Sequence, residues 1–264
     1  MDLGLKGKVA IVTGGSHGIG GGICEILAQE GCNIVANYNS TSAEKAEAFA
    51  KRLEEEYGVK AIAVQADITD EENVIALFSK TYEVFGTVDI LVNNANFMNG
   101  SNGPIEKFDV KKFRVAEAAV VEAMFVTSRE LIKHCRANNK PGHIVNVITK
   151  TVWWSSSVDN SPYVAVKGAC AAVTRSLAHE VASDNIWVNG IIPGYVMVEK
   201  TMLKPDRVER TVKKIPSGRY ATPKEMGNVV AFLCSEAACE INGGLIDCSG
   251  GTLIGDSNPG RNGR

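Results

Sequence analysis

The chain has 264 residues, of which 45% are hydrophobic and 22% are charged, and its formal net charge is −2. This balance offers no electrostatic attraction to nucleic acid or to an anionic membrane, and no apolar run approaches the roughly 18 residues of a spanning helix. The seven cysteines are scattered without a Cys-x-x-Cys pair, and the N-terminal residues lack the apolar segment of a signal peptide. We therefore expect a cytoplasmic protein with reduced thiols and no metal site, with neither nucleic acid nor a membrane among its partners.

The first predicted element is a buried strand that ends in a glycine-rich turn. Val9–Val12 is an apolar run without alternation, as in strands covered on both faces. Four glycines follow, at Gly14, Gly15, Gly18 and Gly20, and beyond them apolar residues recur at helical spacing. Such a turn aims backbone N–H groups at an anion, and its glycines let a phosphate approach closely. Nucleotide binding is therefore favoured over a merely tight connection.

The turn departs from two stricter phosphate-binding patterns. Ile23 stands where the third glycine of Gly-x-Gly-x-x-Gly would fall, and no lysine follows the last glycines. The missing lysine excludes a P-loop.

Strands and helices alternate along the rest of the chain. Further strands are expected at Asn33–Tyr38, Ala61–Gln65, Val88–Val92, His143–Ile148, Ile186–Ile192 and Leu245–Cys248. Helices are expected at Thr41–Tyr57, Asp70–Phe85, Val110–Ala137, Ser161–Ala182 and Pro223–Ser235, and less regular sequence covers 193–217. This alternation predicts a single-domain α/β protein over residues 1–264, with a doubly wound parallel sheet of about seven strands. We expect a substrate loop around residues 193–218 and a loosely ordered tail around residues 255–264.

Ligands of such sheets bind beyond the carboxyl ends of the strands. The segments that follow the predicted strands are Thr13–Gly20, Asn37–Thr41, Asp67–Ile68, Asn93–Asn96, Thr149–Trp154 and Pro193–Val198. The residues that carry chemistry are expected among them.

A tyrosine and a lysine lie four residues apart at the start of the long helix after the fifth strand. Tyr163 and Lys167 therefore share one helix face. A phenol is a poor proton donor and acceptor at neutral pH, and a nearby ammonium is expected to lower its pKa. Tyr163 could then exchange a proton with a substrate oxygen.

Together these motifs resemble the short-chain dehydrogenase/reductase family. The matching residues are Thr13–Gly20, Asp67-Ile68, Asn93-Asn94-Ala95, Tyr163 with Lys167, Pro193-Gly194, Asn242-Gly243 and Asp247–Gly251. The resemblance implies a single Rossmann domain, NAD(H) or NADP(H) as cofactor, and a homo-oligomer of two or four chains. It also implies hydride transfer between the nicotinamide and a carbonyl or alcohol carbon.

The resemblance assigns a role to each matching residue. Tyr163 would be the acid/base, and Lys167 would support it and bind the nicotinamide ribose. The cofactor-binding residues would be Gly14, Ser16, His17, Gly18, Ile19, Gly20, Asn39, Ser40, Asp67, Ile68, Asn94, Ala95, Tyr163, Lys167, Pro193, Gly194 and Val196.

The catalytic serine of the family has no direct counterpart. Counting back thirteen positions from Tyr163 gives Lys150, whereas alignment on the preceding strand gives Thr149. A one-residue insertion around 153–160 would reconcile the two counts. Our hypothesis is that Thr149, which carries a usable hydroxyl, takes the role of the serine. Thr151 or Ser155–Ser157 would come next.

Three further positions depart from the family pattern. Val120 replaces the asparagine that holds a relay water, Asn96 replaces a glycine beside the cofactor, and Val198 replaces a threonine. These departures leave a second interpretation open, a dinucleotide-binding protein with little or no turnover. A third keeps the fold but makes the protein a lyase, dehalogenase or epimerase.

The end of the second strand decides the cofactor. An acid there would bind the ribose 2′-hydroxyl of NAD, but the first acid is Glu44. The neutral Asn39 and Ser40 leave room for a 2′-phosphate, and His17 adds a donor. NADP(H) is therefore favoured over NAD(H).

Aromatic residues follow several strands at the expected mouth of the site. We expect Trp153, Trp154 and Tyr195, with Asn96, to form the pocket of a small-molecule substrate. These side chains favour an apolar or ring-bearing substrate, unless they pack against a neighbouring subunit.

Overall fold

The computed structural model describes residues 2–98, 100, 102–154 and 158–254. Within them, seven parallel strands form one sheet in the order β3-β2-β1-β4-β5-β6-β7. The strands are β1 (Val9–Val12), β2 (Asn33–Tyr38), β3 (Ala61–Gln65), β4 (Ile90–Asn93), β5 (Gly142–Val147), β6 (Ile186–Pro193) and β7 (Leu245–Cys248). The predicted doubly wound parallel sheet is confirmed.

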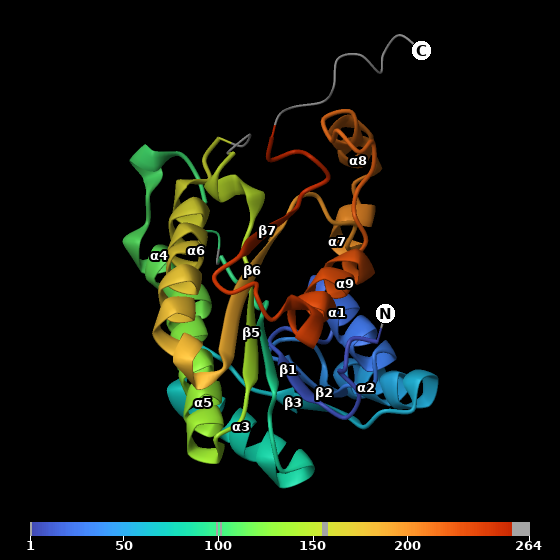
Figure 1. The fold of residues 1–264 in the computed structure, drawn as a ribbon. Helices are drawn as coiled ribbons and strands as arrows, with labels where there is room; N and C mark the ends of the chain where they lie inside the picture. The colour runs from blue at the N-terminus through green and yellow to red at the C-terminus, as the bar shows by residue number, and fades with distance from the viewer. Residues whose placement is uncertain (1, 99, 101, 155–157, 255–264) are drawn as a thin grey trace.

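Helices cover both faces of the sheet. They are α1 (Gly18–Gln29), α2 (Ala43–Tyr57), α3 (Glu71–Phe85), α4 (Val110–Glu117), α5 (Ala123–Asn138), α6 (Ser161–Val181), α7 (Glu199–Met202), α8 (Pro205–Val212) and α9 (Pro223–Leu233). Figure 1 shows α4, α5 and α6 on one side of the sheet, and α1, α2 and α9 on the other. Each layer has its own apolar core against the strands.

Strand β1 pairs with β2 on one side and with β4 on the other. The order of the strands therefore reverses beside β1, at the point where open α/β sheets bind ligands. The loops that follow β1, β2, β4, β5 and β6 all open onto the same edge of the sheet.

Local sequence accounts for where several helices begin and end. Asp70 caps α3 by accepting a hydrogen bond from the backbone of Asn73 at 3.0 Å, and Gly86 ends the helix at a φ of +74°. Thr222 and Glu225 form a reciprocal capping box at the start of α9.

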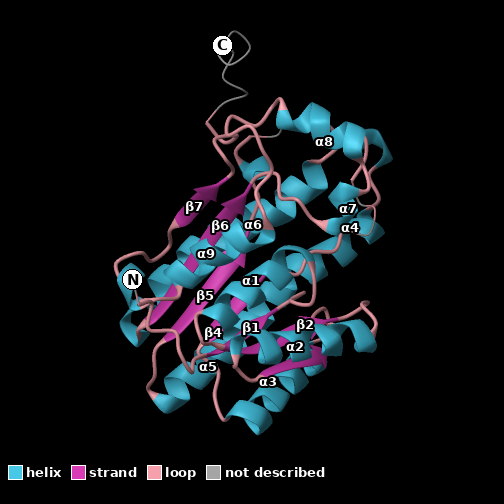
Figure 2. Cartoon of the chain, turned by 90° about the vertical axis from the view of Figure 1, so that its right-hand side faces the viewer, coloured by secondary structure: helices cyan, strands magenta, loops and turns pink. Residues whose placement is uncertain are grey.

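Two elements differ from the sequence prediction. The helix expected over Val110–Ala137 is interrupted by a π-helical segment, η2 (Ala118–Glu122). The segment expected to be irregular after 193 contains α7 and α8, which stand beyond the arrowheads of β6 and β7 in Figure 2. The sequence did not predict α8, and in the structure none of the residues of this helix is buried.

Candidate active site

The glycine-rich turn is held against the loop that follows β4. The hydroxyl of Thr13 accepts hydrogen bonds from the backbone of Asn94 at 3.0 Å and of Ala95 at 3.1 Å. Gly14 has a φ of +60°, and a Cβ on Gly20 would overlap the carbonyl of Gly14. The turn therefore needs glycine at both positions.

A cavity of about 800 Å³ runs along the carboxyl edge of the sheet. It brings together seventeen residues expected in the site: Gly14, Ser16, His17, Gly18, Ile19, Asn39, Ser40, Asp67, Ile68, Asn94, Ala95, Asn96, Thr149, Tyr163, Lys167, Pro193 and Gly194. Sequence reasoning did not assign Asn37, Tyr38, Thr41, Ala66, Thr69, Val115, Ala119, Val147, Ile148 and Glu199, which also line it. Some of these were detectable, because they lie at or next to the ends of predicted strands.

Neutral hydrogen-bonding groups form the cavity wall at the end of β2. The Ser16 hydroxyl lies 3.2 Å from Nδ1 of His17 and 3.4 Å from the Thr41 hydroxyl. The amide of Asn37 donates to the carbonyl of Ala66 at 3.0 Å, and its oxygen accepts from the backbone of Gly14 at 3.3 Å. Asn37 thus ties β2 to the glycine-rich turn.

Asp67 follows β3 at the same end of the cavity. Its carboxylate accepts hydrogen bonds from the backbone and the hydroxyl of Thr69, at 3.0 Å and 2.8 Å. The backbone hydrogen bond lowers the pKa of Asp67 below its usual value, so this side chain carries a negative charge at neutral pH.

Thr149 and Tyr163 meet at the opposite end of the cavity. Thr149 is buried two residues after the end of β5, and its hydroxyl shares a hydrogen bond with the Tyr163 phenol. The Thr151 hydroxyl donates to the Thr149 hydroxyl at 3.3 Å. Tyr163 lies in the first turn of α6, where Pro162 suits the helix start.

The expected lowering of the Tyr163 pKa is not found. Burial raises the pKa of Tyr163 above its usual value, and the hydrogen bond from Thr149 only partly opposes this. The buried Lys167 ammonium donates to the carbonyl of Val147 at 2.7 Å, and burial lowers its own pKa. Desolvation therefore dominates the pKa of Tyr163, and the group that opposes it is Thr149 rather than Lys167.

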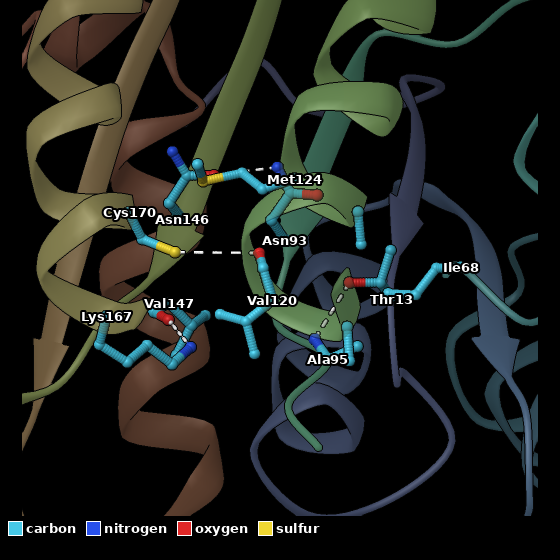
Figure 3. Close-up of a pocket in the computed structure, with 12 residues that line it drawn as sticks. Thr13, Ile68, Asn93, Ala95, Val120, Met124, Asn146, Val147, Lys167 and Cys170 are labelled. Carbon is cyan, nitrogen blue, oxygen red and sulfur yellow. Dashed lines mark hydrogen bonds between the residues drawn. The ribbon is translucent and has the colours of Figure 1, made fainter. Parts of the chain in front are cut away.

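Lys167 also lines a second, smaller cavity of about 10 Å³, roughly the room that one water needs. Figure 3 shows Lys167 beside Val147 at its wall, with Cys170 facing Val120. The Cys170 thiol donates to the carbonyl of Val120 at 3.9 Å, within the π-helical segment. Val120, at the position where the family pattern has an asparagine, therefore offers its backbone carbonyl here but no polar side-chain atom.

Five residues expected in the site do not line the large cavity. Trp153 and Trp154 are 46% and 41% exposed, and neither contributes to its wall. Val196 instead forms an isolated bridge with Ala221, and Gly20 lies behind the turn, where a side chain would overlap Gly14.

Tyr195 is also absent from the wall of the large cavity. Its ring lies 5.8 Å from that of Tyr220 and 4.4 Å from the ammonium of Lys150. Phe97, Val115 and Ile148 contribute apolar side chains to the wall instead.

The chain resembles known enzymes over almost its whole length. The family model described as enoyl-(acyl carrier protein) reductase matches residues 14–252. The 3-oxoacyl-(acyl-carrier-protein) reductase FabG of Aquifex aeolicus is 34% identical over 257 residues, 95% of this chain and 99% of that protein. Glucose 1-dehydrogenase 2 of Bacillus subtilis is 32% identical over 252 residues, 95% of this chain and 96% of that protein.

Solved structures agree with this relationship. L-sorbose reductase of Gluconobacter frateurii, complexed with NADPH and L-sorbose, has a TM-score of 0.88 and 33% identity, covering 96% of this chain and 99% of that one. A short-chain dehydrogenase/reductase of Serratia marcescens has a TM-score of 0.87 and 29% identity, covering 94% and 99%. This chain belongs to the short-chain dehydrogenase/reductase family, and it is an NAD(P)-dependent oxidoreductase. Among its described residues, no helix is long and apolar enough to cross a membrane.

Proposed function

We propose that the protein transfers hydride between NADP(H) and a carbonyl or secondary alcohol carbon of an apolar or ring-bearing small molecule. The observation that carries this proposal is the hydrogen bond between Thr149 and Tyr163 at the wall of the large cavity, one helical turn from Lys167. A hydroxyl and a phenol that share a hydrogen bond can both contact one substrate oxygen.

The residues present fit a dinucleotide. A cradle without side chains at Gly14 and Gly18 leads into the start of α1, as a pyrophosphate requires. Asp67 and Ile68 line the end of the cavity proposed for the adenine. Asn94, Ala95, Pro193 and Gly194 line the part that leads toward Tyr163.

Three side chains would carry the chemistry on the protein's side. The bound nicotinamide would supply or accept the hydride. Tyr163 would give a proton to the substrate oxygen during reduction and take it back during oxidation. The Thr149 hydroxyl would donate a hydrogen bond to the same oxygen, and Lys167 would hold the cofactor ribose beside Tyr163.

The end of β2 supports NADP(H) as the preferred cofactor. The cavity wall there consists of the neutral Asn39, Ser40 and Thr41, with His17 beside Ser16. No carboxylate of this segment repels a 2′-phosphate, because the first acid after β2 is Glu44. We therefore expect NADPH to bind more tightly than NADH.

The remaining expectations complete the proposal. The chain would act as one domain in a cytoplasmic homo-oligomer, with the segment 193–218 covering the substrate. The tail at 255–264 lies outside the described residues.

The first test is titration of the purified protein with NADPH and with NADH, in which cofactor fluorescence measures binding. We expect tighter binding of NADPH, and then oxidation of NADPH that depends on a cyclic or aromatic ketone. Tyr163→Phe should abolish this oxidation while NADPH still binds. Tight binding without turnover across a broad ketone panel would count against the proposed reaction, and tighter NADH binding would overturn the cofactor preference.

A second test addresses Thr149. Thr149→Val removes the hydroxyl and keeps the shape, so turnover should fall about 10²-fold. Thr149→Ser keeps the hydroxyl and should stay near the parent rate. Full turnover in Thr149→Val would show that the Thr149 hydroxyl does not donate the required hydrogen bond to the substrate oxygen.

A further inference from the structure

A buried lysine lies next to the proposed catalytic threonine. Lys150 follows Thr149 directly, opens the short helix η3 (Lys150–Val152), and is only 5% exposed. The ion pairs found among the described residues do not include it. Burial of an ammonium is costly unless something compensates for it. Here the face of the Tyr195 ring, 4.4 Å from Nζ to the ring centroid, provides a cation–π contact.

Tyr195 is itself held in place on several sides. It follows Pro193 and Gly194, which line the large cavity at the end of β6. Its ring packs at a tilt against Tyr220, and its carbonyl accepts a hydrogen bond from the backbone of Ala221 at 2.9 Å. The contact with Lys150 thus joins the loop after β5 to a fixed point in the loop after β6.

The direction of the Thr149 hydroxyl is constrained by its own backbone, which leads directly into the short helix that Lys150 opens. Thr149 is in an extended conformation, with φ −169° and ψ 148°, and caps the start of η3. The backbone N–H groups of Trp153 and Trp154 both donate to the carbonyl of Lys150, at 3.1 Å and 2.9 Å. Because a β-branched threonine has few allowed χ1 rotamers, its hydroxyl direction follows the backbone closely.

We propose that Lys150 is a positioning residue whose contact with the Tyr195 ring holds the Thr149 hydroxyl against Tyr163. The inference rests on the proposed role of Thr149 in the reaction. It also accounts for the absence of Tyr195 from the cavity wall, since its ring serves the lysine rather than the substrate.

The pKa of Tyr163 reports on this arrangement without any substrate. The hydrogen bond from Thr149 opposes the rise that burial causes, and among the described residues Cys170 on the same helix adds to that rise. Lys167 lines the same cavity one helical turn away. If Thr149 moves away, this lowering is lost, and we expect the pKa of Tyr163 to rise further. Phenolate absorbance during a pH titration measures it, once the curve of the matching Tyr163→Phe protein is subtracted.

Four variants distinguish the effect of the cation–π contact from the effect of the charge on Lys150. Lys150→Met removes the ammonium, and Tyr195→Leu removes the ring while the ammonium stays. Both should raise the pKa of Tyr163. Lys150→Arg and Tyr195→Phe keep a cation and a ring, and should leave that pKa near the parent value. An unchanged pKa in Tyr195→Leu would overturn the proposal, because the charge alone would then explain any effect of Lys150→Met.

Steady-state kinetics provide the second readout. In Lys150→Met and Tyr195→Leu, kcat should fall about tenfold while the KM for NADPH stays unchanged. The double variant should be no slower than either single one, because both remove the same contact. Additive losses, or a parent-like kcat in Tyr195→Leu, would overturn the proposal.

Thr149→Val shows which of the two proposals has failed. If Thr149→Val leaves both turnover and the Tyr163 pKa unchanged, the role of Thr149 is refuted, and the inference on Lys150 with it. If Thr149→Val loses activity while Tyr195→Leu does not, only the inference on Lys150 is refuted.

Discussion

At the scale of single residues, burial sets the ionisation of the side chains that matter most. Desolvation raises the pKa of Tyr163 and lowers that of Lys167, so each favours its uncharged form more than it would in water. The same effect acts on His143 at the start of β5, far along the strand from Thr149. Its ring stacks on Trp187 with 5.0 Å between centroids, and no described group hydrogen-bonds its buried Nδ1.

His143 makes stability depend on pH. Burial lowers its pKa from 6.5 to about 4, with a further contribution from nearby Lys8. Between these values the unfolded chain binds a proton that the folded protein does not, so the free energy of unfolding falls as the pH drops from about 6.5 toward 4. Urea unfolding across this range should show a smaller fall in His143→Phe. The exposed His179 provides a control, and His179→Phe should keep the full fall; equal slopes in all three proteins would contradict the assignment.

At the scale of elements, the site depends on how tightly α1 lies against α9. α1 begins at the glycine-rich turn, and the two helices approach closely because glycines face each other's backbone. A Cβ on Gly22 would overlap Pro223, and one on Gly227 would lie 2.7 Å from the carbonyl of Gly22. Glycines in and after the turn are therefore needed for the packing of α1 against α9 as well as for the approach of a phosphate.

Gly22→Ala should therefore push α9 away from α1. We expect it to lower the free energy of unfolding by about 1–3 kcal/mol, as overpacking does in other cores. Denaturant unfolding monitored by circular dichroism measures the change. Gly168→Ala in α6 is the matched control, since a Cβ there meets nothing within 4 Å, and it should leave stability unchanged or slightly higher. An equal loss of unfolding free energy in both variants would show that replacing a helical glycine, rather than overpacking between α1 and α9, causes the effect.

At the scale of the whole molecule, helices on one side of the sheet carry apolar side chains that remain partly exposed. Val110 in α4 and Phe125 in α5 are 48% and 50% exposed. Figure 1 shows α4 and α5 together on the same side of the molecule. Apolar groups gathered on one face are typical of subunit interfaces, which agrees with the expected homo-oligomer.

Phe125→Glu should place a charge in the interface expected here. We expect it to shift the protein to smaller assemblies, as measured by sedimentation velocity. Ile75→Glu in α3, where the parent residue is 43% exposed, should leave the assembly unchanged. Identical sedimentation of the parent and Phe125→Glu would exclude this face as the interface.

Local patterns in the sequence predicted most of the fold. Apolar runs, helical spacing and the glycine-rich turn depend on residues close together in the chain, and these patterns located the seven strands and the major helices. The pairing of Tyr163 with Lys167 is local in the same way, because a separation of four residues puts both on one helix face.

Only the tertiary structure decided the features that join distant segments. The Cys170 thiol on the Val120 carbonyl spans 50 residues, and the Lys150 contact with Tyr195 joins two separate strand ends. Two further features also depend on the tertiary structure. Phe97 lines the cavity whereas Trp153 does not, and the pKa of Tyr163 is raised rather than lowered. Each depends on how deeply a group is buried and on what packs against it, and neither quantity exists until the chain has folded.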